Sequence, residues 1–371
     1  MTRAPAGTRG DALIPCRMVA PRTRLAQPPR HESKLMIFMN RYAGLCRYHA
    51  RVTTPALYPD TPCLRRHALA VGGGHTIAVQ EFGRDDGIAA VVLHGGPGSG
   101  GSPLLRRVFD PARFRIVCID QRGAGASQPR GGISNNRSED LLDDMRQVRK
   151  RLGIQRWLVS GGSWGAALAV AHAAAEPGVV AALLLRSAFL ARAEDIDGFF
   201  QGMAAHHPEA WARFAQAAPA DRRDALLPWL AEQFRAGNPA QQARAALAWW
   251  QWEQRLAATG AVQAPSEDAL TAQIDRYRVQ SHYLLHHCWL TAPTLLERCE
   301  AVPRVPTLLI HSGDDRVCPA QGALDLHARL PGSRLQWIAG AGHDAAHPSL
   351  IAATVAALDS YAAFGNFSLA S

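Results

Sequence analysis

The chain has 371 residues, 47% of them hydrophobic, so it can bury a large core in one big domain or two ordinary ones. Its formal net charge of +9 is concentrated near the N-terminus. Residues 1–56 contain ten Arg or Lys against Asp11 and Glu32, which leaves 30 basic and 29 acidic residues in 57–371. This near-neutral remainder argues against a folded domain built to bind nucleic acid.

The basic segment 1–56 has scattered proline and arginine and no apolar periodicity, which predicts a disordered N-terminal extension. Its first 30 residues lack the roughly 7 to 15 apolar positions of a signal-peptide core, and no run in the chain approaches the ~18 that span a bilayer. An organelle transit peptide has a similar composition. Because Met36 and Met39 lie nearby, we favour a start codon assigned too far upstream.

The seven cysteines are odd in number and follow no C-x-x-C spacing, which favours neither a disulfide framework nor a zinc site. This pattern is typical of a protein of the reducing cytoplasm. They are Cys16, Cys46, Cys63, Cys118, Cys288, Cys299 and Cys318.

In residues 57–189, short apolar runs alternate with helical patterns and repeatedly end at glycine-rich loops. Such runs predict a mostly parallel sheet covered by helices on both faces, with ligands bound at the carboxyl ends of its strands. Polar and apolar residues also alternate from residue 65 through Val79. The expected strands lie at 89–93, 114–119, 157–159 and 179–185, with helices at 138–152, where Ser138 is the N-cap, and 166–175.

Residues 190–295 show helical repeats without a good strand, and six of the nine tryptophans lie there. We expect this segment to be a helical cap inserted into the sheet domain. Strand patterns return at 306–310 and 334–338, and a last helix is expected at 350–364, so 296–371 forms the second part of the core. The predicted fold class is therefore α/β, with an inserted cap.

A serine lies at a sharp turn between the strand 157–159 and the alanine-rich helix. The turn reads Gly161-Gly162-Ser163-Trp164-Gly165, a G-x-S-x-G pattern in which side chains at the two outer glycine positions would clash. The turn holds the hydroxyl where a substrate can reach it, and the following helix offers free N–H groups to a developing negative charge. A chance glycine–serine turn is the alternative, and the partners of Ser163 must decide.

A serine nucleophile needs a base and an acid that orients the base, and both occur after later strands. Asp315 follows the strand 306–310, and His343 follows 334–338 in a glycine turn. The order Ser, Asp, His is that of α/β-hydrolases. We therefore predict Ser163, Asp315 and His343 as the catalytic residues. Asp314 is the rival acid and His347 the alternative base.

The glycine loop that starts at His94 predicts an oxyanion hole. Backbone N–H groups of Gly96 and Trp164, the residue after the nucleophile, would bind the oxyanion. A phosphate-binding loop is the alternative, but the loop lacks the G-K-[ST] ending. His282 and His286 have the i, i+4 spacing of metal ligands beside His287, but no acid supports them, so we expect a packed or solvated helix face and no metal.

Four segments together resemble the proline iminopeptidase (prolyl aminopeptidase) family, which are serine peptidases with the α/β-hydrolase fold. The similarity extends from about residue 57 to about residue 365. The resemblance implies release of an N-terminal proline from small peptides, without metal or organic cofactor, in the cytoplasm, with neither nucleic acid nor membrane as a partner. The segments are His94 to Gly100, Asp120 to Ser127, Gly161 to Gly165 and Gly340 to His343.

The resemblance also implies substrate-binding residues in the cap. Trp252 and Glu253 match the family's tryptophan–glutamate motif, whose acid binds the substrate's terminal amine. A partly desolvated carboxylate would hold a cationic imino group more strongly than water allows. The alternative is core tryptophans with a solvated Glu253. A second family motif carries another glutamate, but this chain has Gln280 there, which loses the charge attraction.

Three functional hypotheses remain open at this stage. The first is a serine aminopeptidase that releases N-terminal proline through an acyl-enzyme. The second is a general esterase or amidase that uses the same three residues with a cap suited to uncharged acyl groups. The third is a non-catalytic binding protein whose basic segment contacts nucleic acid or a membrane, for which a complete catalytic triad would have no purpose.

Overall fold

The computed structural model describes residues 57–257 and 264–367. The basic segment 1–56 lies outside the described residues, so its predicted disorder stays a prediction. Within the described ranges, every helix is too short or too polar to serve as a transmembrane span.

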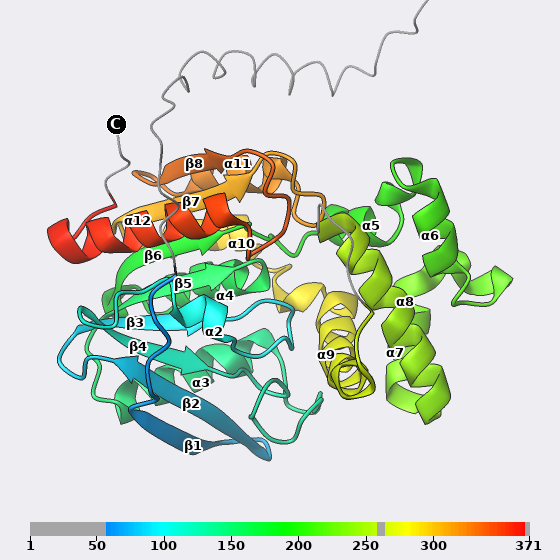
Figure 1. Cartoon of the computed structure of the whole chain (residues 1–371), viewed down its shortest axis with the longest axis horizontal. Coiled ribbons are helices and arrows are strands. Elements are labelled where there is room, and N and C mark those ends of the chain that lie inside the picture. The colour runs from blue at the N-terminus through cyan, green and yellow to red at the C-terminus, as the bar shows by residue number, and fades with distance from the viewer. Residues whose placement is uncertain (1–56, 258–263, 368–371) are drawn as a thin grey trace, which may run out of the picture. The chain divides into compact units, whose positions relative to one another are not determined.

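An eight-stranded sheet runs through the domain in the order β1-β2-β4-β3-β5-β6-β7-β8 (Figure 1). All neighbours from β4 to β8 pair in parallel, whereas the pairs β1–β2 and β2–β4 are antiparallel. The strands are β1 (Arg65–Gly72), β2 (His75–Gly83), β3 (Ile88–Leu93), β4 (Phe114–Ile119), β5 (Trp157–Gly162), β6 (Val180–Arg186), β7 (Thr307–Ser312) and β8 (Arg334–Ile338). The predicted mostly parallel sheet is confirmed.

The central strands are apolar along their whole length because both faces of the sheet are covered. Successive residues of one strand enter different halves of the core: Val91 packs in one buried cluster and Val92 in the other. The expected alternation from residue 65 to Val79 is a hairpin, in which Leu69 pairs with Ile77 across a two-glycine turn.

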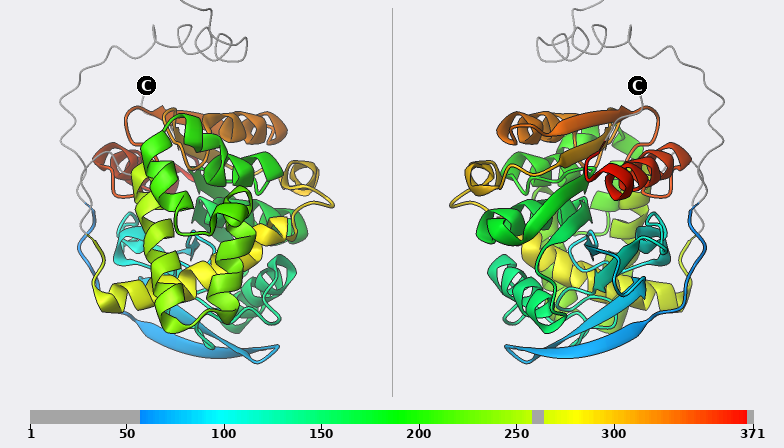
Figure 2. Two further views of the ribbon diagram at one scale, coloured as in Figure 1. Left: turned by 90° about the vertical axis from the view of Figure 1, so that its right-hand side faces the viewer. Right: turned by 90° about the vertical axis from the view of Figure 1, so that its left-hand side faces the viewer.

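Helices cover the sheet on both sides, as the two side views show (Figure 2). Leu358 of α12 packs in the cluster that contains Val92, whereas Leu168 of α4 and Leu326 of α11 pack in the cluster that contains Val91. The helices of the core are α2 (Pro103–Arg106), α3 (Ser138–Arg151), α4 (Trp164–Ala175), α10 (Leu295–Arg298), α11 (Ala320–Arg329) and α12 (Pro348–Phe364). Short 3-10 turns lie at Pro177–Val179 and Cys299–Ala301.

Between β6 and β7 the chain forms a run of helices, which gather to the right of the sheet in Figure 1. Their core is aromatic: the rings of Trp249 and Tyr277 stack with centroids 4.6 Å apart. The helices are α5 (Ala193–Phe200), α6 (Pro208–Ala215), α7 (Leu226–Ala236), α8 (Pro239–Ala257) and α9 (Glu267–Leu285), with 3-10 turns at Gly202–Ala205, Ala220–Ala225 and His287–Trp289. They occupy the interval in which the sequence predicts a cap, while its limits at 190 and 295 stay a prediction.

Candidate active site

Ser163 occupies the turn between β5, which ends at Gly162, and α4, which begins at Trp164. Its backbone is strained, with φ 55° and ψ −122°. A Cβ on Gly161 would lie 2.1 Å from the carbonyl oxygen of Gly165, and a Cβ on Gly165 would lie 2.3 Å from that of Leu93. The clash predicted at both glycine positions is therefore present in the structure.

The acid and the base are in contact. Nδ1 of His343 lies 2.7 Å from Oδ2 of Asp315. The other carboxylate oxygen accepts the backbone N–H groups of Val317 and Cys318, at 2.9 and 2.8 Å, and the Asp315 side chain is fully buried. These contacts fix the carboxylate and, through it, the ring of His343.

The alternative acid and base, Asp314 and His347, make other contacts. Asp314 accepts the hydroxyl of Ser312 at 2.5 Å and so holds the turn after β7. His347 is the N-cap residue of α12, and its Nδ1 is buried without a partner among the described residues. The geometry thus favours Asp315 over Asp314 and His343 over His347.

Burial and two neighbouring side chains determine the electrostatics of the base. Burial opposes protonation of the His343 ring and is the largest single effect, but Asp315 and Cys318 together outweigh it and raise the pKa of His343 well above 6.5. Burial raises the pKa of the neighbouring Cys318 thiol. The site therefore stabilises the protonated form of the His343 ring.

Ser163 and His343 line one cavity but are not hydrogen-bonded to each other. Within the described residues, the side-chain contact of the Ser163 hydroxyl is with Sγ of Cys318, at 3.8 Å. Catalytic hydrogen bonds in unliganded enzymes are often long or poorly aligned and tighten when substrate binds. The three predicted residues thus lie at one site, and a hydrogen bond between Ser163 and His343 stays a prediction.

The glycine loop lies against the nucleophile. A Cβ on Gly95 would come within 3.5 Å of the Cβ of Ser163. Gly96 has φ +109°, and a Cβ there would lie 2.8 Å from the nitrogen of Gly98. Trp164 is the first residue of α4, so its N–H has no acceptor within the helix. The oxyanion roles of Gly96 and Trp164 remain predictions.

Sequence reasoning missed Gln121, the residue that joins the glycine loop to Trp164. The Gln121 amide donates to the carbonyl of His94 at 2.9 Å and accepts the Trp164 indole N–H at 2.8 Å. Its backbone N–H donates to Nε2 of His94 at 3.0 Å. Gln121 therefore ties the glycine loop to the start of α4. Two signals in the sequence point to it: its position two residues after the strand 114–119, and its place in the segment Asp120 to Ser127 that carries the family resemblance.

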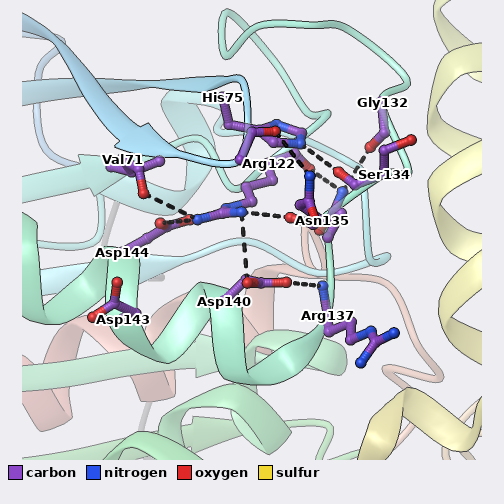
Figure 3. Close-up of polar contacts among 12 residues, drawn as sticks. Val71, His75, Arg122, Gly132, Ser134, Asn135, Arg137, Asp140, Asp143 and Asp144 are labelled. Atoms are coloured by element: carbon purple, nitrogen blue, oxygen red, sulfur yellow. Dashed lines mark hydrogen bonds and ion pairs between the residues drawn. The ribbon is translucent and has the colours of Figure 1, made fainter.

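A buried ion pair anchors the loop that carries Gln121 (Figure 3). The guanidinium of Arg122 binds both carboxylate oxygens of Asp144 in α3, at 2.7 and 2.8 Å, and both side chains are only 3% exposed. It also contacts the carbonyl of Asn135, that of Val71 at 3.4 Å, and Asp140 at 3.7 Å. A buried bidentate pair of this kind fixes the loop precisely.

The substrate-binding candidates Glu253 and Gln280 also line the cavity. Oε1 of Glu253 lies 2.7 Å from the guanidinium of Arg276, and Oε2 accepts the hydroxyl of Tyr277 at 3.0 Å. Gln280 is 8% exposed, and its Oε1 is buried without a partner among the described residues. The Glu253 carboxylate, expected to be partly desolvated and to bind an amine, is therefore mostly buried and paired with the guanidinium of Arg276, a cation that the sequence reasoning missed.

Trp252 lies inside the cap and does not line the cavity in the described structure. It is 1% exposed, stacks on Phe214 with centroids 5.7 Å apart, and donates its indole N–H to the carbonyl of Phe199 at 2.9 Å. Trp252 is thus a residue of the aromatic core and not of the cavity wall, and a part in substrate binding stays a prediction. On a helix, the residue next to an inward-facing one points in another direction, so Glu253 faces the cavity in its place.

The histidines considered as metal ligands form an aromatic group instead. His286 stacks on Trp289 with centroids 4.8 Å apart, and His282 contacts the carbonyl of Asn136 at 3.2 Å. Across residues 57–257 and 264–367, no three His, Cys, Asp or Glu residues are grouped as metal ligands would be. The five cysteines of these ranges are free thiols.

Comparison with known proteins identifies the family. Residues 90–348 match the family model described as alpha/beta hydrolase fold. The proline iminopeptidase of Xylella fastidiosa (strain 9a5c) is 35% identical over 312 residues, which cover 82% of this chain and 99% of that protein. The chain belongs to the proline iminopeptidase family. Its relative from Arabidopsis thaliana, also named proline iminopeptidase, is 35% identical over 78% of this chain and 77% of its own.

Solved structures show the same fold at lower sequence identity. The crystal structure of proline iminopeptidase from Mycobacterium smegmatis is 18% identical, with a TM-score of 0.53, covering 81% of this chain and 100% of that chain. A haloalkane dehalogenase variant, DbeA-M1 from Bradyrhizobium elkanii, is 21% identical, with a TM-score of 0.55, covering 81% and 98%. The predicted α/β-hydrolase fold, family and serine hydrolase class are confirmed.

Proposed function

We propose that this protein is a prolyl aminopeptidase that releases N-terminal proline from small peptides through an acyl-enzyme. The observation that carries the proposal is the buried Asp315–His343 pair, 2.7 Å between Oδ2 and Nδ1, which opens on the cavity that Ser163 lines. The family to which the chain belongs supplies the choice of proline. We also propose the cytoplasm as its location, in keeping with the cysteine pattern, and neither nucleic acid nor membrane as a partner.

In the proposed reaction, Oγ of Ser163 attacks the carbonyl carbon of the first residue, and Nε2 of His343 takes its proton. Asp315 holds the ring by Nδ1 and stabilises the imidazolium. The N–H groups of Gly96 and Trp164 bind the oxyanion, and one such donor contributes about 3 to 4 kcal/mol. His343 then protonates the leaving amine, the shortened peptide departs, and water activated by His343 releases proline from Ser163.

The cap supplies the amine-binding groups. An ionised carboxylate has about four acceptor sites, so Glu253 keeps free lone pairs beside those that Arg276 and Tyr277 occupy. The unpartnered Oε1 of Gln280 can accept a second N–H of the substrate amine. Both groups lie on the cap side of the cavity. The proposal is that they hold the proline nitrogen while its carbonyl faces Ser163.

A specific observation favours the alternative, a general esterase or amidase. Gln280 is neutral and Glu253 is neutralised by Arg276, so the cavity attracts a cationic amine less than two free carboxylates would. Binding of an uncharged acyl group does not depend on this charge attraction.

Hydrolysis of proline arylamide by the purified protein tests the proposal. We expect proline release by the wild type and none by Ser163→Ala, with alanine arylamide as the comparison for the first residue. A fluorophosphonate that labels Ser163 serves as the control for a competent site. Labelling of Ser163 without any cleavage of proline arylamide would refute the proline specificity and leave the alternative.

A further inference from the structure

A buried guanidinium without a counter-ion lies beside the nucleophile. Arg186 ends β6, is 4% exposed and lines the cavity with Ser163. Its backbone carbonyl accepts the N–H of Ser163 at 2.9 Å, and its Nη2 lies 3.6 Å from the point that a Cβ on Gly162 would occupy. The guanidinium of Arg186 therefore lies close to Ser163, within about the length of one substrate residue of the bond that Ser163 would attack.

The described structure contains no hydrogen bond or ion pair to this guanidinium, and its Nε is buried without a partner. Burial alone lowers the pKa of Arg186 to about 10, so the group stays charged at neutral pH. An uncompensated buried cation is costly and requires an anion.

The other charges in the cavity are matched. The charged residues that line it are Arg186, Asp195, Glu253, Arg276 and His343. Glu253 pairs with Arg276 at 2.7 Å, and Asp195 pairs with Arg192 at 2.8 Å, a guanidinium that Glu194 and Asp325 also contact. His343 has its own carboxylate partner. Among the charged residues that line the cavity, Arg186 is thus the one without a partner in the described structure.

We propose that Arg186 binds a carboxylate on the residue that follows proline, so that the preferred substrates are short and carry a negative charge next to the scissile bond. This rests on the proposed function: in proline, the only carboxyl carbon is the scissile carbonyl, so an anion near the bond belongs to the leaving residue. A zwitterionic dipeptide places its amine at Glu253 and its carboxylate at Arg186. The cavity of about 290 Å³ is close to the lower end of the ~300–1,000 Å³ found for small-molecule sites.

The carboxylate has two possible sources, the α-carboxylate of a dipeptide and an acidic side chain. We would measure kcat/KM for Pro-Gly, Pro-Gly-amide and Pro-Asp-amide. Hydrogen bonds to charged groups predict that a bound carboxylate raises kcat/KM about ten- to a hundredfold over Pro-Gly-amide. A gain for Pro-Gly alone assigns the α-carboxylate, and a gain for Pro-Asp-amide alone assigns the side chain. Equal values for all three substrates would overturn the proposal.

The variants Arg186→Met and Arg186→Lys separate binding by Arg186 from intrinsic reactivity, since the substrate ratio in each variant uses the same leaving groups. We expect the ratio to fall to about one in Arg186→Met and to stay above one in Arg186→Lys. An unchanged ratio in Arg186→Met would refute the role of Arg186. If Arg186→Met fails to fold, Arg186→Gln, which also removes the charge, provides the same comparison, and an unchanged ratio there would refute the role of Arg186. Absence of proline release from every substrate would instead refute the proposed function.

Discussion

Replacing Glu253 by glutamine removes the charge that links the cap to the proposed amine site. The Glu253 carboxylate and the Arg276 guanidinium are 2.7 Å apart and only 13% and 19% exposed. Two unit charges about 4 Å apart interact by roughly 4 kcal/mol at an effective dielectric constant of ~20. Removing one partner of a buried pair costs about 3 to 5 kcal/mol. We expect the free energy of unfolding of Glu253→Gln to fall by an amount in that range.

The same substitution removes an ionic partner of the substrate amine. A hydrogen bond to a charged group contributes about 1.5 to 3 kcal/mol, so kcat/KM for proline arylamide should fall by roughly ten- to 150-fold. Hydrolysis of a neutral ester such as p-nitrophenyl acetate should fall far less, because it presents no amine. Steady-state kinetics with both substrates, together with urea unfolding, measure the two effects.

A matched control exists on the surface of the cap. Glu232 pairs with Arg222 at 3.0 Å, but both side chains are about half exposed, at 50% and 42%. Exposed pairs contribute about 0 to 1 kcal/mol, so Glu232→Gln should change neither stability nor kinetics appreciably. If proline arylamide hydrolysis by Glu253→Gln matched that of Glu232→Gln, the assignment of Glu253 to the amine would be refuted.

Three further predictions concern the base, the elbow and the sheet. His343 must be neutral to accept a proton and its pKa is raised, so the acid limb of the kcat/KM profile should lie above pH 6.5. Asp315→Asn removes the neighbouring charge and should shift that limb toward lower pH. A limb at the same pH in both pH-rate profiles would contradict this. Gly165→Ala places a Cβ 2.3 Å from the Leu93 carbonyl, so it should abolish fluorophosphonate labelling and lower the melting temperature, and normal labelling would contradict the elbow. Hydrogen bonds from Arg65 and other partners outweigh burial and lower the pKa of Glu81 to about 2, so its stabilisation is present above pH 4.5 and lost as pH falls toward 2. Glu81→Gln should cost about 3 kcal/mol in neutral urea unfolding and flatten that acid dependence, and unchanged stability would exclude the pairing.

The sequence predicts the sheet well because its strands are apolar on both faces and end at glycine-rich loops. The same logic places Ser163, Asp315 and His343, since the carboxyl ends of parallel strands meet at one edge. The hairpin of β1 and β2 was missed, although Gly72, Gly73 and Gly74 interrupt the alternation and are a turn signal.

The cap shows where sequence reasoning ends. The family resemblance suggested that Trp252 and Glu253 act together, but their neighbouring positions on α8 place Trp252 in the aromatic core and Glu253 at the cavity. The ion pair of Glu253 with Arg276 joins α8 to α9. Whether Arg186 has a partner depends on which side chains the fold places around its guanidinium. Such contacts depend on tertiary packing, which residue spacing along the chain does not predict.

The claim on which the account depends is that Ser163 carries the acyl group during turnover. Rapid quenching of the wild type with a proline aryl ester, followed by peptide mass spectrometry, tests it most directly. We predict one prolyl group on the peptide that contains Ser163, and none after Ser163→Ala. A prolyl adduct on another residue, or turnover retained in Ser163→Ala, would contradict the account.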